Sequence, residues 1–485
     1  MNREFLVNIF FLLGINLLIK PFYVFFIERD VQNVVGASDY GIYFTLLNLS
    51  LILQIVNDFG IRNFSSRYIA QHSQLLQKYF PDLLSLKIIL SIFYALLTLL
   101  AAWYLGYLLQ YTLLVLLIAS SRIIISFIDF FRASIIGLAH YRSDSILSVL
   151  HRLILILLCA FFLWNPAWRT KFSIRDFALL ELISLLITLL IAAFLLLPYL
   201  SKLRIRFHPQ RLRVLLRQSY PYAIIVFLMM IYNRVDAIMI EQLLPNGKAQ
   251  VGIYAAAYRL LDAAIMFSFL FANLLLPMFS RMLKAKESLQ QLLQLSFELL
   301  LAASITGVLA VYFFRNPIME LLYLEADVYW GKILGTLIWS FIAVSTTHII
   351  GTALLANGSL KALNGLFLVG IVLNIALNLL FIPEYEAYGA AITTTATQFF
   401  IVIGELALAI YILKIKLTNS FLKIGLFTLL LSLIAYLCQT YLSLMWMLQF
   451  GLILVAGIVL AFGLKLMDWK AMKILFMNRN STSDD

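Results

Sequence analysis

The chain has 485 residues, of which 63% are hydrophobic and only 12% are charged, with a formal net charge of +12 and a mean hydropathy of +0.96. A soluble protein carries about 25% charged residues, so this composition excludes a soluble domain and indicates a protein that crosses the membrane many times. The basic residues are scattered among short polar segments instead of forming one patch, so we expect no nucleic acid as a partner.

Apolar runs recur along the whole chain, and about 20 such residues suffice to cross a bilayer as a helix. We count fourteen runs of this kind. The predicted fold is therefore an all-α integral membrane protein with about fourteen transmembrane helices. The expected helices are Leu6–Ile27, Tyr40–Gly60, Leu83–Leu105, Leu113–Ile136, Ile146–Trp164, Phe177–Leu197, Tyr220–Leu243, Ile253–Phe279, Leu292–Phe314, Ile333–Leu355, Leu363–Ile382, Tyr388–Leu413, Ile424–Cys438 and Leu444–Leu466.

The loops between these runs alternate in charge. One set holds most of the Lys and Arg residues, including the stretch Lys202–Arg217, whereas the opposite set holds acidic pairs such as Glu384 and Glu386. Loops rich in Lys and Arg stay in the cytoplasm, so both termini are expected there. The loop with Arg169 and Arg175 is an exception, because it falls on the outer side. A contact with an anionic group on that side is the alternative explanation for it.

An internal repeat divides the chain. Gly41-Ile42-Tyr43 opens the second run and Gly252-Ile253-Tyr254 opens the eighth, and a basic residue precedes each motif, Lys20 by 21 positions and Arg234 by 18. Both stretches enter from an outer loop, so the repeat is parallel and predicts two six-helix lobes followed by two further helices. The expected parts are an N-terminal lobe over 1–200, a basic cytoplasmic linker over 201–218, a C-terminal lobe over 219–416, a helix pair over 417–467 and a cytoplasmic polar tail over 468–485.

Motifs of common enzyme sites do not occur in the sequence. It lacks the G-x-x-x-x-G-K-[ST] loop of P-loop ATPases as well as G-x-G-x-x-G, H-E-x-x-H and G-x-S-x-G. The five histidines are dispersed, and the two cysteines, Cys159 and Cys438, both lie in apolar runs. We therefore expect no enzymatic activity, no catalytic residues, no cofactor and no metal site.

Charged residues inside the apolar runs are the candidates for function. A charge in hydrocarbon costs about 2.5–3.5 kcal/mol, so each of them needs a protein or water neighbour. Arg259 and Asp262 are three positions apart, as are Asp129 and Arg132, and this spacing favours an ion pair on one helix face. For these two pairs, ion pairing that only fixes helix packing is at least as good an explanation as function.

Three other cations suggest a surface for an anionic substrate. Lys20 has no acidic residue on its own helix, and Arg122 lies seven positions before Asp129 on nearly the same stripe. Arg234 and Asp236 are two apart and point to nearly opposite sides, so they need different partners. Arginine binds phosphate well through its planar fork of donors, which favours an anionic ligand for Lys20, Arg122 and Arg234.

The acidic residues of these runs are candidates for ion pairing or proton coupling, and their spacing does not select one of them. They are Asp58, Asp129, Asp236, Asp262, Glu298 and Glu405.

An ordered series of short motifs follows the tenth run: LLANGSLK over Leu354–Lys361, then Asn374 and Asn378, Ile382-Pro383, and GAAITT over Gly389–Thr394. The series resembles the pattern of Wzx-type polysaccharide flippases, within the multidrug/oligosaccharidyl-lipid/polysaccharide exporter superfamily. With its supporting pieces, the resemblance covers nearly the whole chain. These pieces are Tyr40–Tyr43, Asp58–Gly60, Arg234 with Asp236, and Val251–Tyr254.

The resemblance implies a function. Such a flippase moves an undecaprenyl-pyrophosphate-linked oligosaccharide from the inner to the outer leaflet of the bacterial cytoplasmic membrane, by alternating access, for surface polysaccharide biosynthesis. A cationic cavity between the lobes would receive the pyrophosphate, with Lys20, Arg122, Arg234 and Arg259 as the candidates for contact. The implied partners are the lipid-linked oligosaccharide, membrane lipids, and polysaccharide polymerase and chain-length proteins.

Two alternatives from the same superfamily stay open. A peptidoglycan-precursor flippase also has a cationic cavity, and a multidrug antiporter would take cationic substrates through a cavity dominated by acids. A membrane-embedded glycosyltransferase or polymerase would show large outer loops and a convergent acidic site, and the sequence has neither.

Overall fold

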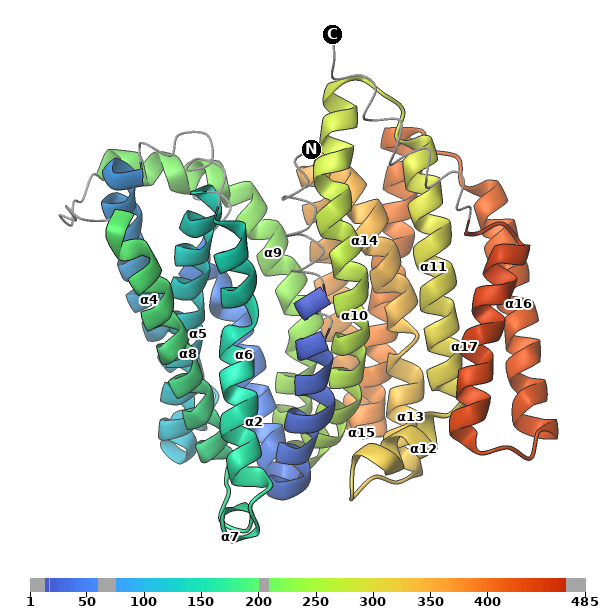
Figure 1. Ribbon diagram of the computed structural model, residues 1–485, viewed down its shortest axis with the longest axis horizontal. Coiled ribbons are helices and arrows are strands. Elements are labelled where there is room, and N and C mark those ends of the chain that lie inside the picture. Colours follow the sequence, from blue (N-terminus) through green and yellow to red (C-terminus); the bar gives the residue numbers. More distant parts are fainter. Residues whose placement is uncertain (1–13, 17, 60–75, 139, 200–208, 468–485) are drawn as a thin grey trace. The chain divides into compact units, whose positions relative to one another are not determined.

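The computed structural model describes residues 14–16, 18–59, 76–138, 140–199 and 209–467. Every regular element in these ranges is helical, and twelve helical spans are long and apolar enough to cross a membrane. The predicted all-α membrane fold is thereby confirmed. By its internal contacts the chain separates into two compact units, Met1–Ala255 and Ala256–Asp485, which are described one at a time (Figure 1).

Two of the twelve spans are much longer than one bilayer crossing. Gly14–Asp58 has 45 residues and Leu360–Leu413 has 54, whereas about 20 residues suffice. Each is interrupted by one residue with a positive φ, Gly36 at 83° in the first and Glu386 at 53° in the second, so two helices meet there. Each span is thus long enough for two crossings, in line with the two apolar runs that the sequence places in it. Fourteen crossings remain the expectation.

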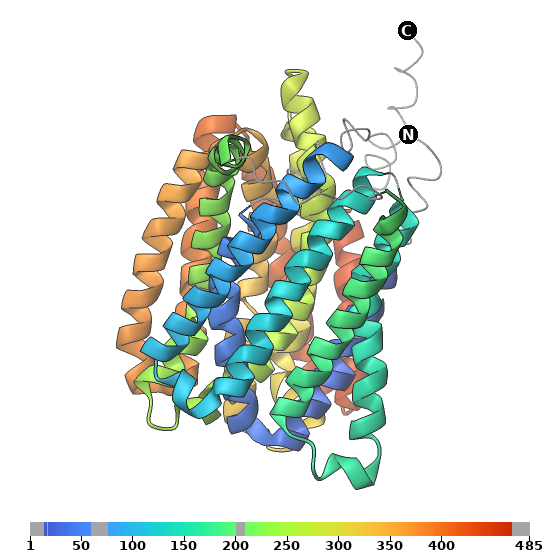
Figure 2. The same ribbon diagram turned by 90° about the vertical axis from the view of Figure 1, so that its left-hand side faces the viewer.

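Unit 1 is a bundle in which α2 contacts α4 and α9, and α5 contacts α4 and α8. Figure 2 shows its blue to green helices running side by side. Its elements are η1 (Tyr23–Glu28), α2 (Arg29–Asp58), α4 (Leu76–Tyr104), α5 (Tyr107–Gly137), α6 (Tyr141–Leu163), α7 (Pro166–Arg169), α8 (Ile174–Leu196), η3 (Leu197–Tyr199), α9 (Pro209–Leu243) and the beginning of α10 (Gly247–Lys284).

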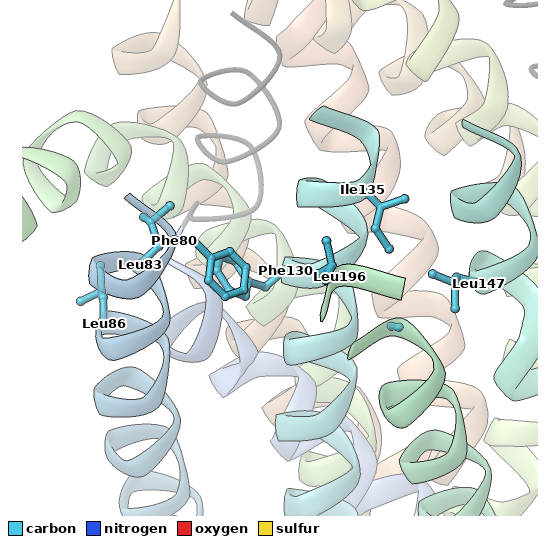
Figure 3. Close-up of a cluster of buried hydrophobic side chains, with 8 residues drawn as sticks. Phe80, Leu83, Leu86, Phe130, Ile135, Leu147 and Leu196 are labelled. Carbon is cyan, nitrogen blue, oxygen red and sulfur yellow. The ribbon is translucent and has the colours of Figure 1, made fainter. Parts of the chain in front are cut away.

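A cluster of buried apolar side chains joins α4, α5, α6 and α8 (Figure 3). The rings of Phe80 and Phe130 stack with their centroids 5.0 Å apart, and Ile135, Leu147 and Leu196 belong to the same cluster. Lipid is as apolar as these side chains, so helices in a membrane associate mainly through close packing of this kind. The cluster therefore fixes α4, α5, α6 and α8 against one another, and Arg122 and Glu181 lie on two of these helices.

Unit 2 is also helical, and α14 packs along α15 in it. The predicted C-terminal helix pair, α16 and α17, packs against α11. Its elements are the rest of α10, α11 (Gln290–Phe313), α12 (Arg315–Leu322), α13 (Val328–Leu337), α14 (Ser340–Ala356), α15 (Leu360–Leu413), α16 (Thr418–Tyr441) and α17 (Trp446–Gly463).

The division by contacts differs from the division by repeat. It falls between Ala255 and Ala256, within α10, so α9 and the beginning of α10 lie in unit 1. Helix α9 begins at Pro209, so the described part of the predicted linker over 201–218 is helical. The remainder of that linker and the predicted tail over 468–485 lie outside the described residues. The lobe boundaries and the cytoplasmic termini stay predictions.

Candidate functional site

Arg122 on α5 forms an ion pair with Glu181 on α8. Their Nη2 and Oε1 atoms are 2.9 Å apart, and the side chains are 15% and 12% exposed. The hydroxyl of Tyr43 on α2 donates to Oε2 of Glu181 at 3.0 Å. The Nε atom of Arg122 is buried without a hydrogen-bond partner among the described residues. Glu181 therefore holds Arg122 in place, and any phosphate bound by Arg122 must use the donors that Glu181 leaves.

Four cations of unit 1 act electrostatically on one residue, His151 on α6. Two of them lie on α5, one lies on α6 next to His151, and one precedes η1. They are Lys20, Arg122, Arg132 and Arg152. This group is called the His151 cation cluster below.

Arg152 is the member of this cluster that the sequence reasoning missed. Its guanidinium carbon lies 5.3 Å from the centre of the Tyr23 ring, which is the geometry of a cation–π contact. The signal that could have found it is a basic residue within the apolar run Ile146–Trp164. The first and fifth predicted helices therefore meet at an aromatic and a cationic side chain.

Arg132 is held by two carboxylates. Its Nη1 atom lies 3.4 Å from Oδ1 of Asp129, three positions earlier on α5, so the pair expected from this spacing is present. Its Nε atom lies 2.8 Å from Oδ1 of Asp144 on α6, which is the shorter contact. Asp144 precedes the predicted fifth run, and its side chain is only 8% exposed. Arg132 is thus neutralised within unit 1.

Asp58, at the end of α2, has a cationic partner on α4. The side chain of Lys87 is 0% exposed, and its Nζ atom lies 3.4 Å from Oδ1 of Asp58. The same ammonium donates to the carbonyl oxygen of Asn57 at 3.0 Å and contacts the hydroxyl of Ser126. A cation at the C-terminus of a helix interacts favourably with its terminal carbonyls, so Lys87 fixes the end of α2. A role for Asp58 in proton coupling stays a prediction.

Asp236 on α9 is buried, and its Oδ2 atom accepts a hydrogen bond from the hydroxyl of Tyr254 at 3.1 Å. Arg234, two positions earlier, is half-buried. Tyr254 ends the second Gly-Ile-Tyr motif, just as Tyr43 ends the first and donates to Glu181. The tyrosines of the repeated motif therefore do the same thing in both places, which is to donate to a carboxylate.

The glycines of the same motif bring α2 and the start of α10 into backbone contact. A Cβ atom at Gly41 would lie 1.9 Å from the carbonyl oxygen of Lys248, and one at Gly252 would lie 1.9 Å from that of Ala37. The contact is reciprocal, because each glycine meets the residue four positions before the other glycine. Gln32 adds a hydrogen bond from its Nε2 atom to the carbonyl oxygen of Gly252 at 2.9 Å. Only glycine fits at these two positions.

The exceptional basic loop on the predicted outer side meets an anionic group of its own chain. The Nη2 atom of Arg169 lies 3.2 Å from Oδ1 of Asp30, whose side chain is 6% exposed. The Nη1 atom of Arg169 also donates to the carbonyl oxygen of Leu163 at 3.2 Å. Arg169, the last residue of α7, therefore links the end of α6 to the beginning of α2.

Unit 2 holds the remaining candidates. Arg259 and Asp262 are both half-buried on α10, and their mutual ion pair stays a prediction. Oε1 of Glu298 on α11 accepts hydrogen bonds from Ser420 at 2.6 Å and from Gln294 at 3.0 Å, while Oε2 lies 3.5 Å from the ammonium of Lys423. Glu298 therefore fastens α16 to α11.

The two asparagines of the recognised motif are fully buried in α15. The Nδ2 atom of Asn378 donates to Oδ1 of Asn374 at 3.2 Å, and the Nδ2 atom of Asn374 donates to the hydroxyl of Thr397 at 3.5 Å. The bond between Asn374 and Thr397 joins the two halves of α15. Across the described ranges, no group of three or more His, Cys, Asp or Glu residues is arranged to hold a metal ion.

Sequence comparison identifies a family. The profile of a family described as "Polysaccharide biosynthesis protein" matches residues 5–283, which is more than half of the chain. No curated protein matches the chain in sequence.

Three solved structures show the same fold. A structure of the lipid II flippase MurJ in an inward closed conformation has a TM-score of 0.73 at 16% identity, over 96% of this chain and 100% of that chain. An inward-facing multidrug resistance MATE family transporter of the MOP superfamily has a TM-score of 0.63 at 16% identity, over 81% and 95%. A MOP superfamily transporter from Pyrococcus furiosus has a TM-score of 0.56 at 14% identity, over 84% and 95%. At these identities the likeness concerns the fold alone.

Proposed function

We propose that this chain, which belongs to the family of polysaccharide biosynthesis proteins, moves an undecaprenyl-pyrophosphate-linked oligosaccharide from the inner to the outer leaflet of the bacterial cytoplasmic membrane. The family match and the likeness of the fold to MurJ and to MATE transporters both support a multi-pass membrane transporter. The lipid-linked substrate, its direction and the use of alternating access are the proposal. Polysaccharide polymerase and chain-length proteins as partners belong to the proposal too.

The observation that carries this proposal is the His151 cation cluster. Arg122 and Arg132 are held by carboxylates, and Lys20 and Arg152 also act electrostatically on His151. Positive charge inside the membrane is costly, so its concentration there favours an anionic ligand such as pyrophosphate. The planar donor fork of arginine suits phosphate oxygens. Arg234 and Arg259 remain candidates for the same contact.

A cationic drug is a poorer fit to unit 1. A site for such a drug needs carboxylates that face the substrate, whereas Glu181, Asp144 and Asp58 each lie within 4 Å of a basic side chain. A peptidoglycan precursor is the second candidate substrate, because the fold matches that of MurJ over 96% of this chain. It is also a lipid-linked sugar, so the same cations would serve it.

Reconstitution in liposomes tests the proposal. Purified protein is incorporated with lipid-linked oligosaccharide, lipid-linked peptidoglycan precursor or fluorescent cationic drugs, and movement across the bilayer is measured for each. We expect movement of the lipid-linked oligosaccharide, with a reduced rate for Arg152→Ala and an unchanged rate for the control Lys361→Ala, whose side chain is exposed at the start of α15. Transport of drugs alone contradicts the proposal, and transport of the precursor alone favours the second candidate.

A further inference from the structure

A cavity of about 440 Å³ lies in unit 2, where α11 passes into α12 and where α16 turns into α17. Its wall combines aromatic rings with an arginine and two side-chain amides. The residues that matter for its chemistry are Tyr312, Phe314, Arg315, Asn316, Gln439 and Trp446. Ligand pockets measure about 300–1,000 Å³ and combine an apolar wall with a few polar groups, so this cavity has the size and lining of such a pocket. We call it the Arg315 pocket.

Arg315 is fixed by its surroundings but is not neutralised by them. Its guanidinium carbon lies 4.8 Å from the centre of the Tyr312 ring, and its Nη1 atom donates to the carbonyl oxygen of Tyr312 at 3.0 Å. A Cβ atom at Gly335 of α13 would collide with Cδ of Arg315, so the side chain packs on this glycine. No carboxylate of the described residues lies at ion-pair distance from Arg315, and the buried Glu298 and Glu405 do not line the pocket. A guanidinium has five N–H groups, so most of its donors are left for an anionic ligand.

The two amides of the pocket also keep groups for a ligand. A Cβ atom at Gly331, one turn before Gly335 on α13, would collide with Oδ1 of Asn316, so packing places this amide. Its Nδ2 atom makes no hydrogen bond to a described residue. Gln439 donates from Nε2 to the carbonyl oxygen of Phe313 at 3.2 Å, and its Oε1 atom accepts no hydrogen bond in the described part of the chain. One amide donor and one amide acceptor are thus available for hydroxyl groups.

The aromatic side chains give the pocket flat apolar surfaces. The rings of Tyr312 and Trp339 meet edge to face with their centres 5.7 Å apart. The ring of Phe314 lies 6.3 Å from those of Trp446 and Phe450. Trp446 is half-buried, and its indole N–H donates to no described residue. It therefore offers both an apolar ring and a hydrogen-bond donor.

The pocket belongs to the predicted outer side of the membrane. Helix α16 begins just after Lys414 and Lys416, in a basic loop that is expected in the cytoplasm, so its other end at Tyr441 is expected outside. Tryptophan and tyrosine are common at membrane–water interfaces, which accounts for the aromatic rings alone. It does not account for an arginine without a carboxylate beside two amides with free groups.

We propose that the Arg315 pocket binds an acidic sugar, which is a saccharide unit with a carboxylate. A sugar ring has apolar C–H faces, which pack on aromatic rings, and hydroxyl groups at its edge, which bond to the amides of Asn316 and Gln439. The carboxylate receives the planar donors of Arg315. The choice of a saccharide rests on the proposed function, which delivers an oligosaccharide to this side, whereas the negative charge follows from Arg315 itself.

Binding of soluble sugars to the purified full-length chain tests the pocket. The chain is placed in phosphatidylcholine nanodiscs, and dissociation constants are measured by saturation-transfer difference NMR. The two probes are cellobiouronic acid and cellobiose, because the first has a carboxylate where the second has a hydroxymethyl group. We expect cellobiouronate to bind about tenfold more tightly than cellobiose, as hydrogen bonds to a charged group predict.

Two pairs of variants separate the charge from the rings. Arg315→Gln should bring the two dissociation constants together, whereas Arg175→Gln, exposed at the start of α8, should keep the tenfold difference. A variant that only loosens the fold weakens both sugars and keeps their ratio. Trp446→Ala should weaken both sugars about threefold or more, because each loses a ring to pack on. Trp103→Ala, which removes an exposed tryptophan of α4, should weaken neither.

If Arg315→Gln does not fold, the exposed Gln439 provides a second test, and Gln439→Ala should weaken cellobiouronate binding about threefold. Glycerol 1-phosphate represents the headgroup of an anionic phospholipid. If it binds as tightly as cellobiouronate, the pocket is a headgroup site and the proposal is overturned. Equal binding of the two sugars by the wild type, or a preference that persists in Arg315→Gln, overturns it too. The probes carry no lipid and need no transport, so failure here is distinct from failure of the proposed function.

Discussion

Arg122 and Glu181 are 59 positions apart in sequence, yet their side chains form an ion pair at 2.9 Å between α5 and α8. Tyr43 completes the arrangement from α2, because its hydroxyl donates to the second carboxylate oxygen. Three helices are thus joined at one carboxylate beside the His151 cation cluster. A cation of the candidate site is therefore also part of the scaffold of unit 1.

A double-mutant cycle measures the strength of this ion pair. Glu181→Gln leaves the mostly buried guanidinium of Arg122 without its counter-charge, so we expect a lower free energy of unfolding and a lower melting midpoint. Arg122→Gln should have a similar effect, and the double variant should lose less than the sum of the two. The expected coupling energy is about 1–3 kcal/mol. Additive losses mean that the two residues act independently.

The reciprocal glycine contact between α2 and α10 predicts a severe effect of a small substitution. Gly252→Ala places a methyl group where the carbonyl oxygen of Ala37 lies, so the helices have to separate. Overpacking of this kind costs about 1–3 kcal/mol, seen as a lower melting midpoint. Gly14→Ala is the control in the same unit, because a methyl group there meets nothing within 4 Å. Equal midpoints for the two variants contradict the contact.

Lys87→Met tests the buried end of α2. The methionine fills a similar volume but cannot donate to the carbonyl oxygen of Asn57 or compensate Asp58. We expect destabilisation of about 3 kcal/mol, the usual cost of removing one partner of a buried ion pair. Adding Asp58→Asn should recover part of the loss, since it removes the remaining charge. No recovery in the double variant shows that Asp58 does not interact with Lys87.

Lys20→Ala and Arg234→Ala test the cationic surface itself. If these side chains bind pyrophosphate, each variant should reduce the transport rate by about tenfold or more, because a hydrogen bond to a charged group contributes about 1.5–3 kcal/mol. Membrane insertion and the melting midpoint should change little. Arg234→Lys keeps the charge but loses the planar fork, so an intermediate rate is expected. If cells with Lys20→Ala and cells with Arg234→Ala both make the full amount of surface polysaccharide, these two side chains do not bind the pyrophosphate.

The helices were predictable from sequence because an apolar run of bilayer length has to satisfy its backbone hydrogen bonds within the membrane, and an α-helix does so. The sequence also separates the two halves of the spans Gly14–Asp58 and Leu360–Leu413, which the structure joins across Gly36 and Glu386. Spacing along one helix was equally informative, and Asp129 with Arg132 forms the pair that it indicates.

Contacts between helices could not be predicted in the same way. The partner of Arg122 lies 59 positions away and that of Asp30 lies 139 positions away, so no helical period connects them. The sequence shows the repeated Gly-Ile-Tyr motif, but it does not show which residues the glycines and tyrosines of the motif contact. Reciprocal backbone contact at Gly41 and Gly252 depends on which helices are neighbours, and that is decided by the packing of the whole unit. Arg152 was overlooked for a simpler reason, since one basic residue in an apolar run was not counted.

Transport by the purified protein in liposomes tests the central claim most directly. A lipid-linked oligosaccharide with a pyrophosphate bridge is compared with the same lipid-linked sugar carrying no phosphate, and appearance in the opposite leaflet is followed over time. The account predicts transport of the pyrophosphate-linked substrate, with a rate that falls in Lys20→Ala and Arg152→Ala. Equal transport of both lipids by the wild type and by both variants would contradict it.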